Sequence, residues 1–292
     1  MTKRSYKVVD VFTRKPLLGN PVAVVLDSEG LDTAAMQKIA NWTNLSETTF
    51  VLPPTTSKAD YRLRIFTPRS ELPFAGHPTL GSAHALLEAG RLALRPSGRW
   101  VQESGIGLVE LTIDVAGENR KLALALPPAK MTDLTAADTA ELQQILKCPI
   151  AEKVAPAIVD VGPKWVVTHF IDAKSVLNLR PDFARLAAFE RSLGVTGVIA
   201  FGSHASGEAA IEVRAFAPSC GVEEDPVCGS GNGSAAVFQW QRGLLPPGGK
   251  NYIASQGQCV GRAGRIEVEV DAQGKVSIGG GCVTCVDGSL TI

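Results

Sequence analysis

The sequence predicts an α+β protein of two domains that share one fold. The first observation is an internal repeat, because the pattern Arg-x-Phe-x-Pro occurs at 64–68 and again 150 residues later at 214–218. The second is a glycine-rich stretch that recurs at a similar spacing, as ELPFAGHPTLGSAH and as EEDPVCGSGNGSAAVF. The third is the length of 292 residues, which exceeds one typical domain. A repeat of whole halves indicates two domains related by a pseudo-twofold axis.

The first half opens with a strand, a turn and a strand in YKVVDVFTRKPLLGNPVAVVL. β-branched residues flank a turn cluster between Pro16 and Pro21, which is typical of a hairpin. Asp32 is the expected N-cap of a helix that continues through Ala40. Two further strands are predicted in NLSETTFVL and in YRLRIFTP, whose apolar residues alternate.

The glycine-rich stretch leads into a predicted helix, GSAHALLEAG, that ends at Gly90, and two hairpin strands in VELTIDV and KLALALP follow. PPAKMTDLTAAD has the composition of a linker, with Asp133 or Thr135 as the cap of the helix AADTAELQQIL. We expect domains at 1–118 and 119–282. The tail, at about 283–292, lies past the repeat and is expected to add a strand to the first domain.

Charge and hydropathy exclude several classes of partner. The formal net charge is zero and no basic block occurs, so nothing favours nucleic acid or an anionic membrane. The sequence contains no run of about 18 apolar residues, which is the length needed to span a bilayer. The basic N-terminus lacks the apolar core of a signal peptide, which predicts a cytoplasmic protein. A homodimer is the expected oligomer, because homodimers are the common default among soluble oligomeric proteins.

Cysteines and histidines do not form a recognisable metal site. Six cysteines are too few for a disulfide scaffold of this length. Cys282 and Cys285 form a CxxC without a second ligand pair, so we interpret them as buried strand residues, with a redox pair or a metal site as the alternatives. His84, His169 and His204 lack metal-ligand spacing and are predicted to be structural or exposed. No metal is therefore expected.

The two glycine-rich stretches suggest a site for a small anion. A helix N-terminus carries unpaired N–H groups and partial positive charge, and glycine lets the backbone approach a ligand closely. Two such helix starts facing each other would suit a small carboxylate substrate. The alternative is that the glycines only permit close packing of helix on strand.

Taken together and in order, GNPVAVV, NLSETTFV, FTP, ELPFAGHPTLG and EDPVCGSGNG resemble the phenazine-biosynthesis isomerase (PhzF-like) family over essentially the full length. Members of that family resemble diaminopimelate epimerase in fold. The resemblance implies that each domain wraps a curved sheet around a central helix and that the active site lies in the inter-domain cleft. It also implies an isomerase that uses no cofactor and moves a proton on a small carboxylate.

The family pattern also implies roles for individual residues. It assigns acid–base catalysis to Glu47 of the NLSE motif. It implies that the substrate is bound by Ser46, Gly76, His77, Asp225, Gly229 and Ser230, with Gly229 and Ser230 as a carboxylate clamp.

The residues themselves allow these roles beside plainer ones. Glu47 enters an apolar strand, where partial desolvation would raise its pKa and let it carry a proton near neutral pH; otherwise it is an exposed strand-edge residue. His77 is either a substrate contact or a capping or packing residue. Asp225 is expected both to cap its helix and to contact substrate.

Cys228 matches Ala75 in the repeat. In the related epimerases and racemases, a cysteine in each half serves as one of two opposing acid–base thiols, and this chain lacks one of them. An epimerase or racemase that uses Glu47 and Cys228 is therefore the second hypothesis, since a thiol at a helix N-terminus has a lowered pKa. The plainer reading is a small buried cysteine. The third hypothesis is a protein that binds a carboxylate without catalysis.

Overall fold

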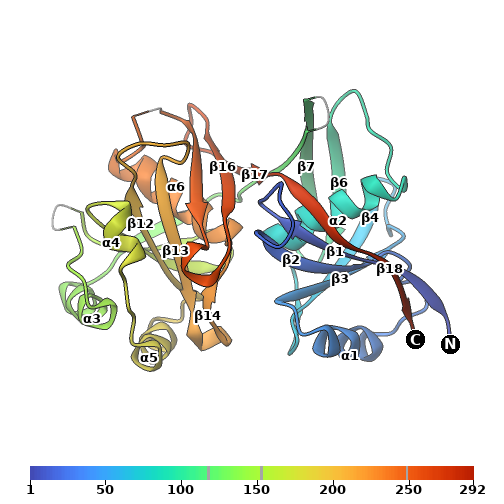
Figure 1. Cartoon of the computed structure of the whole chain (residues 1–292), viewed down its shortest axis with the longest axis horizontal. Coiled ribbons are helices and arrows are strands. Elements are labelled where there is room, and N and C mark those ends of the chain that lie inside the picture. The colour runs from blue at the N-terminus through green and yellow to red at the C-terminus, as the bar shows by residue number, and fades with distance from the viewer. Residues whose placement is uncertain (117–118, 152–153, 248) are drawn as a thin grey trace. The chain divides into compact units, whose positions relative to one another are not determined.

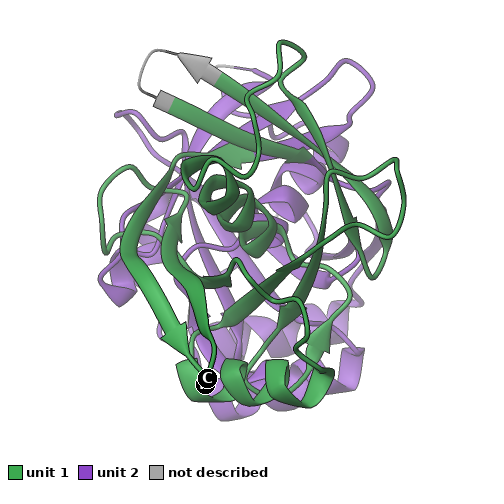
Figure 2. Cartoon of the chain, turned by 90° about the vertical axis from the view of Figure 1, so that its right-hand side faces the viewer, with its two compact units in different colours: residues 1–124, 279–292 green, residues 125–278 purple. Residues whose placement is uncertain are grey.

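The computed structural model describes residues 1–116, 119–151, 154–247 and 249–292. Contacts divide the chain into two compact units, which we call unit 1 (1–124 and 279–292) and unit 2 (125–278) (Figure 2). Residues 117–118, where the sequence analysis ends the first domain, lie outside the described residues.

The sheet of unit 1 has the strand order β18-β1-β2-β3-β4-β6-β7-β8, with the short β5 paired to β4. The β2–β3 and β4–β6 pairs are parallel and the others are antiparallel. The C-terminal strand β18 pairs with the N-terminal strand β1, so the two ends of the chain lie side by side (Figure 1). The strands are β1 (Lys3–Val11), β2 (Asn20–Val25), β3 (Glu47–Leu52), β4 (Tyr61–Phe66), β5 (Glu71–Leu72), β6 (Arg99–Ser104), β7 (Gly107–Ala116), β8 (Asn119–Ala125) and β18 (Cys282–Thr291).

Two helices pack on this sheet in different ways. Helix α1 (Thr33–Thr43) begins at the predicted cap, where Asp32 Oδ1 accepts a hydrogen bond from the Ala35 N–H at 2.8 Å. Its apolar face packs against Phe50 and Phe66. Helix α2 (Gly76–Glu88) contacts β1, β2, β3 and β18, and 11 of its 13 residues are buried. The sheet therefore curves around α2, which is the central helix of the unit.

Unit 2 repeats this arrangement with the order β9-β10-β11-β12-β13-β15-β16 and with β14 paired to β13. Helix α6 is the buried central helix and contacts β10, β11, β12 and β16. The strands are β9 (Lys130–Asp133), β10 (Ala157–Asp160), β11 (Lys164–His169), β12 (Gly197–Ser203), β13 (Ile211–Ala217), β14 (Val222–Asp225), β15 (Asn251–Gln256) and β16 (Gly264–Val270). A further strand, β17 (Val276–Gly280), includes the last residues of unit 2 and the residues at which the chain re-enters unit 1. The helices are α3 (Ala136–Leu146), α4 (Ala173–Leu177), α5 (Phe183–Leu193) and α6 (Gly229–Arg242).

The strand registers show how closely the halves correspond. In unit 1 Thr48 pairs with Phe66, and in unit 2 the residues 150 positions later, Val198 and Phe216, form the same pair. Across β1, β2, β3, β4 and β6 of unit 1, successive pairs are antiparallel, parallel, antiparallel and parallel. The same order holds across β10, β11, β12, β13 and β15 of unit 2. The expected α+β class, with a curved sheet around a central helix, is confirmed.

Two local expectations, for the start of α2 and for the supposed linker, were wrong, one strand was missed, and one of the two alternative caps of α3 was confirmed. Helix α2 begins at Gly76, so the glycine-rich stretch forms the helix itself and does not precede it. The strand β6 was not predicted, and the supposed linker contains β9. Thr135, not Asp133, caps α3, because its Oγ1 accepts from the Asp138 N–H at 3.1 Å. Among the helices of the described residues, none is long and apolar enough to cross a membrane.

Candidate active site

A carboxyl group and an imidazole meet inside unit 1. Glu47 is the first residue of β3, and His77 is the second residue of α2. Glu47 Oε2 lies 3.2 Å from His77 Nε2, with side chains that are 15% and 8% exposed. Burial raises the pKa of Glu47 to about 7, against the smaller opposing effect of a hydrogen bond from Ser46. Glu47 is thus not an exposed strand-edge residue, and its carboxyl group can exchange a proton near neutral pH.

Neighbouring backbone fixes the position of this carboxyl group. The parallel pairing of β2 and β3 sets Val22 opposite Glu47. The Ser46 hydroxyl, just before β3, donates to Asn20 Oδ1 at 3.5 Å at the start of the buried β2. Ser46 therefore links the two strand starts and also contacts the carboxyl group that it precedes.

Two glycines of α2 differ in what they do. A Cβ on Gly81 would lie 2.4 Å from Cγ1 of Val22, so Gly81 is required for the helix to pack on β2. A Cβ on Gly76 would meet only Leu124 Cδ2, at 3.9 Å, which is an ordinary contact. The packing explanation therefore accounts for Gly81 and leaves Gly76 free to serve a ligand that approaches the helix start.

In unit 2, Cys228 is the N-cap of α6. Its buried Sγ accepts a hydrogen bond from the Gly231 N–H at 3.3 Å. Ala75 occupies the same position before α2 and makes no such side-chain bond. Asp225 was expected to cap this helix, and that was wrong: its Oδ1 accepts from the Val227 N–H at 3.0 Å, one turn earlier.

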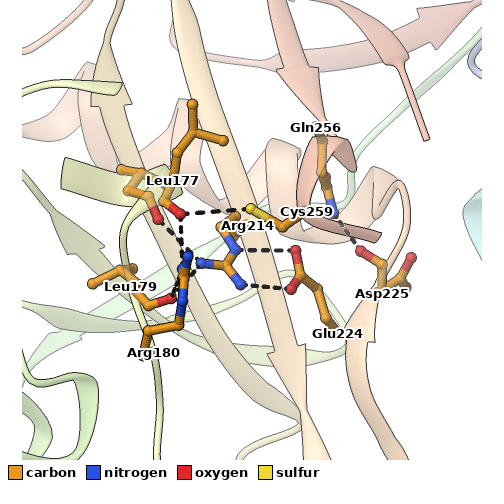
Figure 3. Close-up of polar contacts among 9 residues, drawn as sticks. Leu177, Leu179, Arg180, Arg214, Glu224, Asp225, Gln256 and Cys259 are labelled. Carbon is orange, nitrogen blue, oxygen red and sulfur yellow. Dashed lines mark hydrogen bonds and ion pairs between the residues drawn. The ribbon is translucent and has the colours of Figure 1, made fainter. Parts of the chain in front are cut away.

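Gln256 holds the turn before α6 in place. Its Nε2 donates to the Asp225 carbonyl at 2.8 Å (Figure 3). Its Oε1 accepts from the Cys228 N–H at 3.1 Å and from Asn232 Nδ2 at 2.7 Å. One buried amide thus fixes Asp225, the cap residue and the first turn of the helix. Sequence reasoning missed Gln256, because nothing around the end of β15 indicates these distant partners.

A buried ion pair supports the same turn. Arg214 on β13 makes two hydrogen bonds to Glu224 on β14, at 3.0 and 2.7 Å, and these side chains are only 6% and 7% exposed (Figure 3). The guanidinium also donates to the carbonyls of Val176 and Leu179. The sequence singled out Arg214 as a marker of the repeat but did not reveal this role.

Ser230 lies in the first turn of α6, after Gly229. Its Oγ accepts a hydrogen bond from the indole Nε1–H of Trp165 at 3.1 Å, and Cys228 Sγ lies 3.6 Å away. Backbone N–H groups at such a helix start, together with a hydroxyl group, can bind a carboxylate.

The two units differ at the position of the carboxyl group. The register that pairs Thr48 with Phe66 makes Gly197 the counterpart of Glu47. A Cβ at Gly197 would lie 2.1 Å from the Phe216 carbonyl oxygen, so no side chain fits there. The repeat is therefore one of fold and not of chemistry: the acidic group belongs to unit 1 and the thiol to unit 2.

The surroundings of Cys282, Cys285, His84 and His169 disfavour the charged forms of these side chains. Burial raises the pKa of Cys282 to about 12 and also raises that of Cys285, which disfavours the thiolates that redox chemistry or metal binding would need. Burial lowers the pKa values of His84 and His169, and His169 stacks on Phe201. Within the described ranges, no group of three or more His, Cys, Asp or Glu is placed to hold a metal ion.

Residues 9–288 match the family model of the phenazine biosynthesis-like proteins. The chain belongs to the phenazine biosynthesis-like (PhzF) family. Several relatives are named isomerases, among them the trans-2,3-dihydro-3-hydroxyanthranilate isomerases, and this chain is an isomerase of the PhzF type. The resemblance stated from the sequence motifs is thereby confirmed.

Two relatives and one solved structure show the extent of the similarity. "Antisense-enhancing sequence 1" of Schizosaccharomyces pombe is 42% identical over the whole of both chains. The trans-2,3-dihydro-3-hydroxyanthranilate isomerase of Pseudomonas chlororaphis is 32% identical, with 98% of this chain and 99% of the relative covered. The crystal structure of a PhzF-family protein of Bacillus anthracis matches over both full chains, with a TM-score of 0.86 and 23% identity, which shows the shared fold.

Proposed function

We propose that this PhzF-family isomerase moves a proton between two carbons of a small unsaturated carboxylate, with Glu47 as the acid–base group. The observation that carries the proposal is the buried Glu47 carboxyl group, whose pKa is about 7 and which lies against His77. As a carboxylate, Glu47 removes a proton from a carbon next to the double bond. The electron pair shifts the double bond, and the resulting carboxylic acid returns the proton to another carbon. Atoms and charge balance without a co-reactant.

The other predicted residues bind the substrate in this proposal. The N–H groups of Gly76 and His77 at α2, and of Gly229 and Ser230 at α6, stabilise the negative charge of the substrate. Ser46 and Asp225 make polar contacts with it. Trans-2,3-dihydro-3-hydroxyanthranilate, the compound named for the Pseudomonas chlororaphis relative, is the first substrate to test.

The test follows isomerisation of trans-2,3-dihydro-3-hydroxyanthranilate by the purified full chain. Glu47→Gln should lower kcat by roughly 100-fold to 10,000-fold, as expected for loss of a general acid–base group. The matched control is Glu71→Gln, which changes a more exposed glutamate of the same unit that pairs with Arg64. Turnover in Glu47→Gln equal to that of the control contradicts the proposal.

A further inference from the structure

The hydrogen bond between Trp165 and Ser230 has a direction that chemistry fixes. An indole nitrogen can only donate, so the Ser230 oxygen must be the acceptor of the 3.1 Å bond. Trp165 is buried, on β11, and it packs beside Gly197, where a Cβ would come within 2.7 Å of its Cζ3. The ring is therefore held firmly in the orientation that makes this bond.

This bond limits what Ser230 can do with its own hydrogen. A serine hydroxyl carries one hydrogen and two lone pairs, and Trp165 uses one lone pair. The hydrogen remains available to donate. The neighbouring acceptor is Cys228 Sγ at 3.6 Å, which already accepts from the Gly231 N–H. A charged carboxylate oxygen is a stronger acceptor than a neutral thiol.

We propose that Trp165 is a positioning residue that makes the Ser230 hydroxyl a dedicated donor to the carboxylate of the ligand. The proposal rests on the proposed carboxylate-binding role of Ser230. It deepens that role by naming the residue that sets the direction of the bond and by restricting the ligand group to a hydrogen-bond acceptor.

The repeat supports a role particular to unit 2. Val22 occupies the register position of Trp165 in unit 1, and it has no polar group that could orient a neighbour. His77, two residues after the cap position Ala75, is the counterpart of Ser230, which follows the cap Cys228. Unit 1 thus has a titratable residue where unit 2 has a neutral hydroxyl group held by an indole. A neutral donor binds carboxylate equally across the pH range in which Glu47 titrates.

The test is a double-mutant cycle on the affinity for anthranilate, a carboxylate probe that cannot be isomerised, measured by calorimetry. Trp165→Phe should weaken binding roughly fivefold to tenfold, which corresponds to one hydrogen bond. In the Ser230→Ala background the same change should cost less than about twofold, because the interaction has already been removed. Trp100→Phe is the matched control: Trp100 is also buried, and its Nε1 has no hydrogen-bond partner within the described part of the chain.

A further variant distinguishes the effect of losing the hydrogen bond from the effect of changing the shape of the ring. It carries β-(3-benzothienyl)alanine at position 165, which keeps the bicyclic shape and replaces the N–H by sulfur, and it should lose the same affinity as Trp165→Phe. Three results would overturn the inference. One is a Trp165→Phe loss of anthranilate affinity that is equal in the wild-type and Ser230→Ala backgrounds. The others are full affinity in the benzothienyl variant and no binding of anthranilate by the wild type. Failure of the proposed function appears separately, as absent isomerisation of trans-2,3-dihydro-3-hydroxyanthranilate while the binding cycle holds.

Discussion

His77 Nε2 and Glu47 Oε2 lie 3.2 Å apart in unit 1, although their residues are 30 positions apart in the sequence. The contact exists because β3 begins at Glu47 where α2 begins at Gly76. Burial raises the pKa of the Glu47 carboxyl group to about 7, and a hydrogen bond from Ser46 has a smaller opposing effect. A carboxyl group balanced in this way is suited to both accept and donate a proton near neutral pH.

The raised pKa of Glu47 predicts a pH dependence of stability. The folded state holds this proton more tightly than the unfolded state does, so the free energy of unfolding should fall as pH rises from about 4.5 to about 7. Over this pH range the free energy of unfolding of the wild type should fall by about 3 kcal/mol at most relative to that of Glu47→Gln. Above about pH 7 the difference should not grow further. Urea unfolding of both proteins between pH 5 and 8 measures the difference. Parallel curves would show that Glu47 titrates normally.

Gly76 and Gly81 should respond differently to alanine. Gly81→Ala forces a Cβ against Val22 and should destabilise the protein by about 1–3 kcal/mol. Gly76→Ala has room for its Cβ and should leave the melting temperature unchanged or slightly raised. If Gly76 serves a ligand, this variant should nevertheless raise KM. Thermal melts and steady-state kinetics on both variants measure these effects. An unchanged KM in Gly76→Ala would show that Gly76 has no role in ligand binding.

Cys228→Ser should keep most of the turnover. Serine is a good N-cap and can still accept from the Gly231 N–H, so α6 should start normally. If Glu47 moves the proton alone, kcat should fall by no more than about tenfold. A loss of roughly 100-fold to 10,000-fold at an unchanged melting temperature would instead make Cys228 the second acid–base group. That result would favour the epimerase hypothesis.

Gln256→Met should impair binding as well as stability. It removes the acceptor of the Cys228 N–H and one of the two acceptors of the Asn232 side-chain amide, at a cost of about 1–3 kcal/mol in stability. Because the turn from Asp225 to Ser230 loosens, KM should also rise. The control is Gln239→Met, on α6, where a buried glutamine accepts from Tyr252 and no predicted site residue is touched. A similar KM in both variants would limit Gln256 to stability.

The sequence predicted features that depend on local chemistry or on the repeat. Asp32 as a cap follows from its side chain alone, and the pairing of Thr48 with Phe66 recurs in unit 2 as the repeat requires. The role of Glu47 came from the family resemblance, and only the structure showed its burial against His77.

The missed features depend on distant partners. The four residues of β9 carry little strand signal and become a strand by pairing with β10. Gly76 was expected in a turn because glycine is a weak helix former, yet burial of α2 within the curved sheet overrides that preference. Gln256 is 24 to 31 residues from the groups that it binds, so no local pattern could reveal its role.

The central claim is that Glu47 carries the transferred proton, and solvent deuterium tests it most directly. Turnover of trans-2,3-dihydro-3-hydroxyanthranilate in D₂O should place deuterium at the newly protonated carbon, because the Glu47 carboxylic acid formed by proton removal exchanges with solvent before it returns the proton. In Glu47→Gln, incorporation should fall together with turnover by at least about 100-fold while the melting temperature is retained. Deuterium incorporation by Glu47→Gln at the wild-type rate would contradict the account.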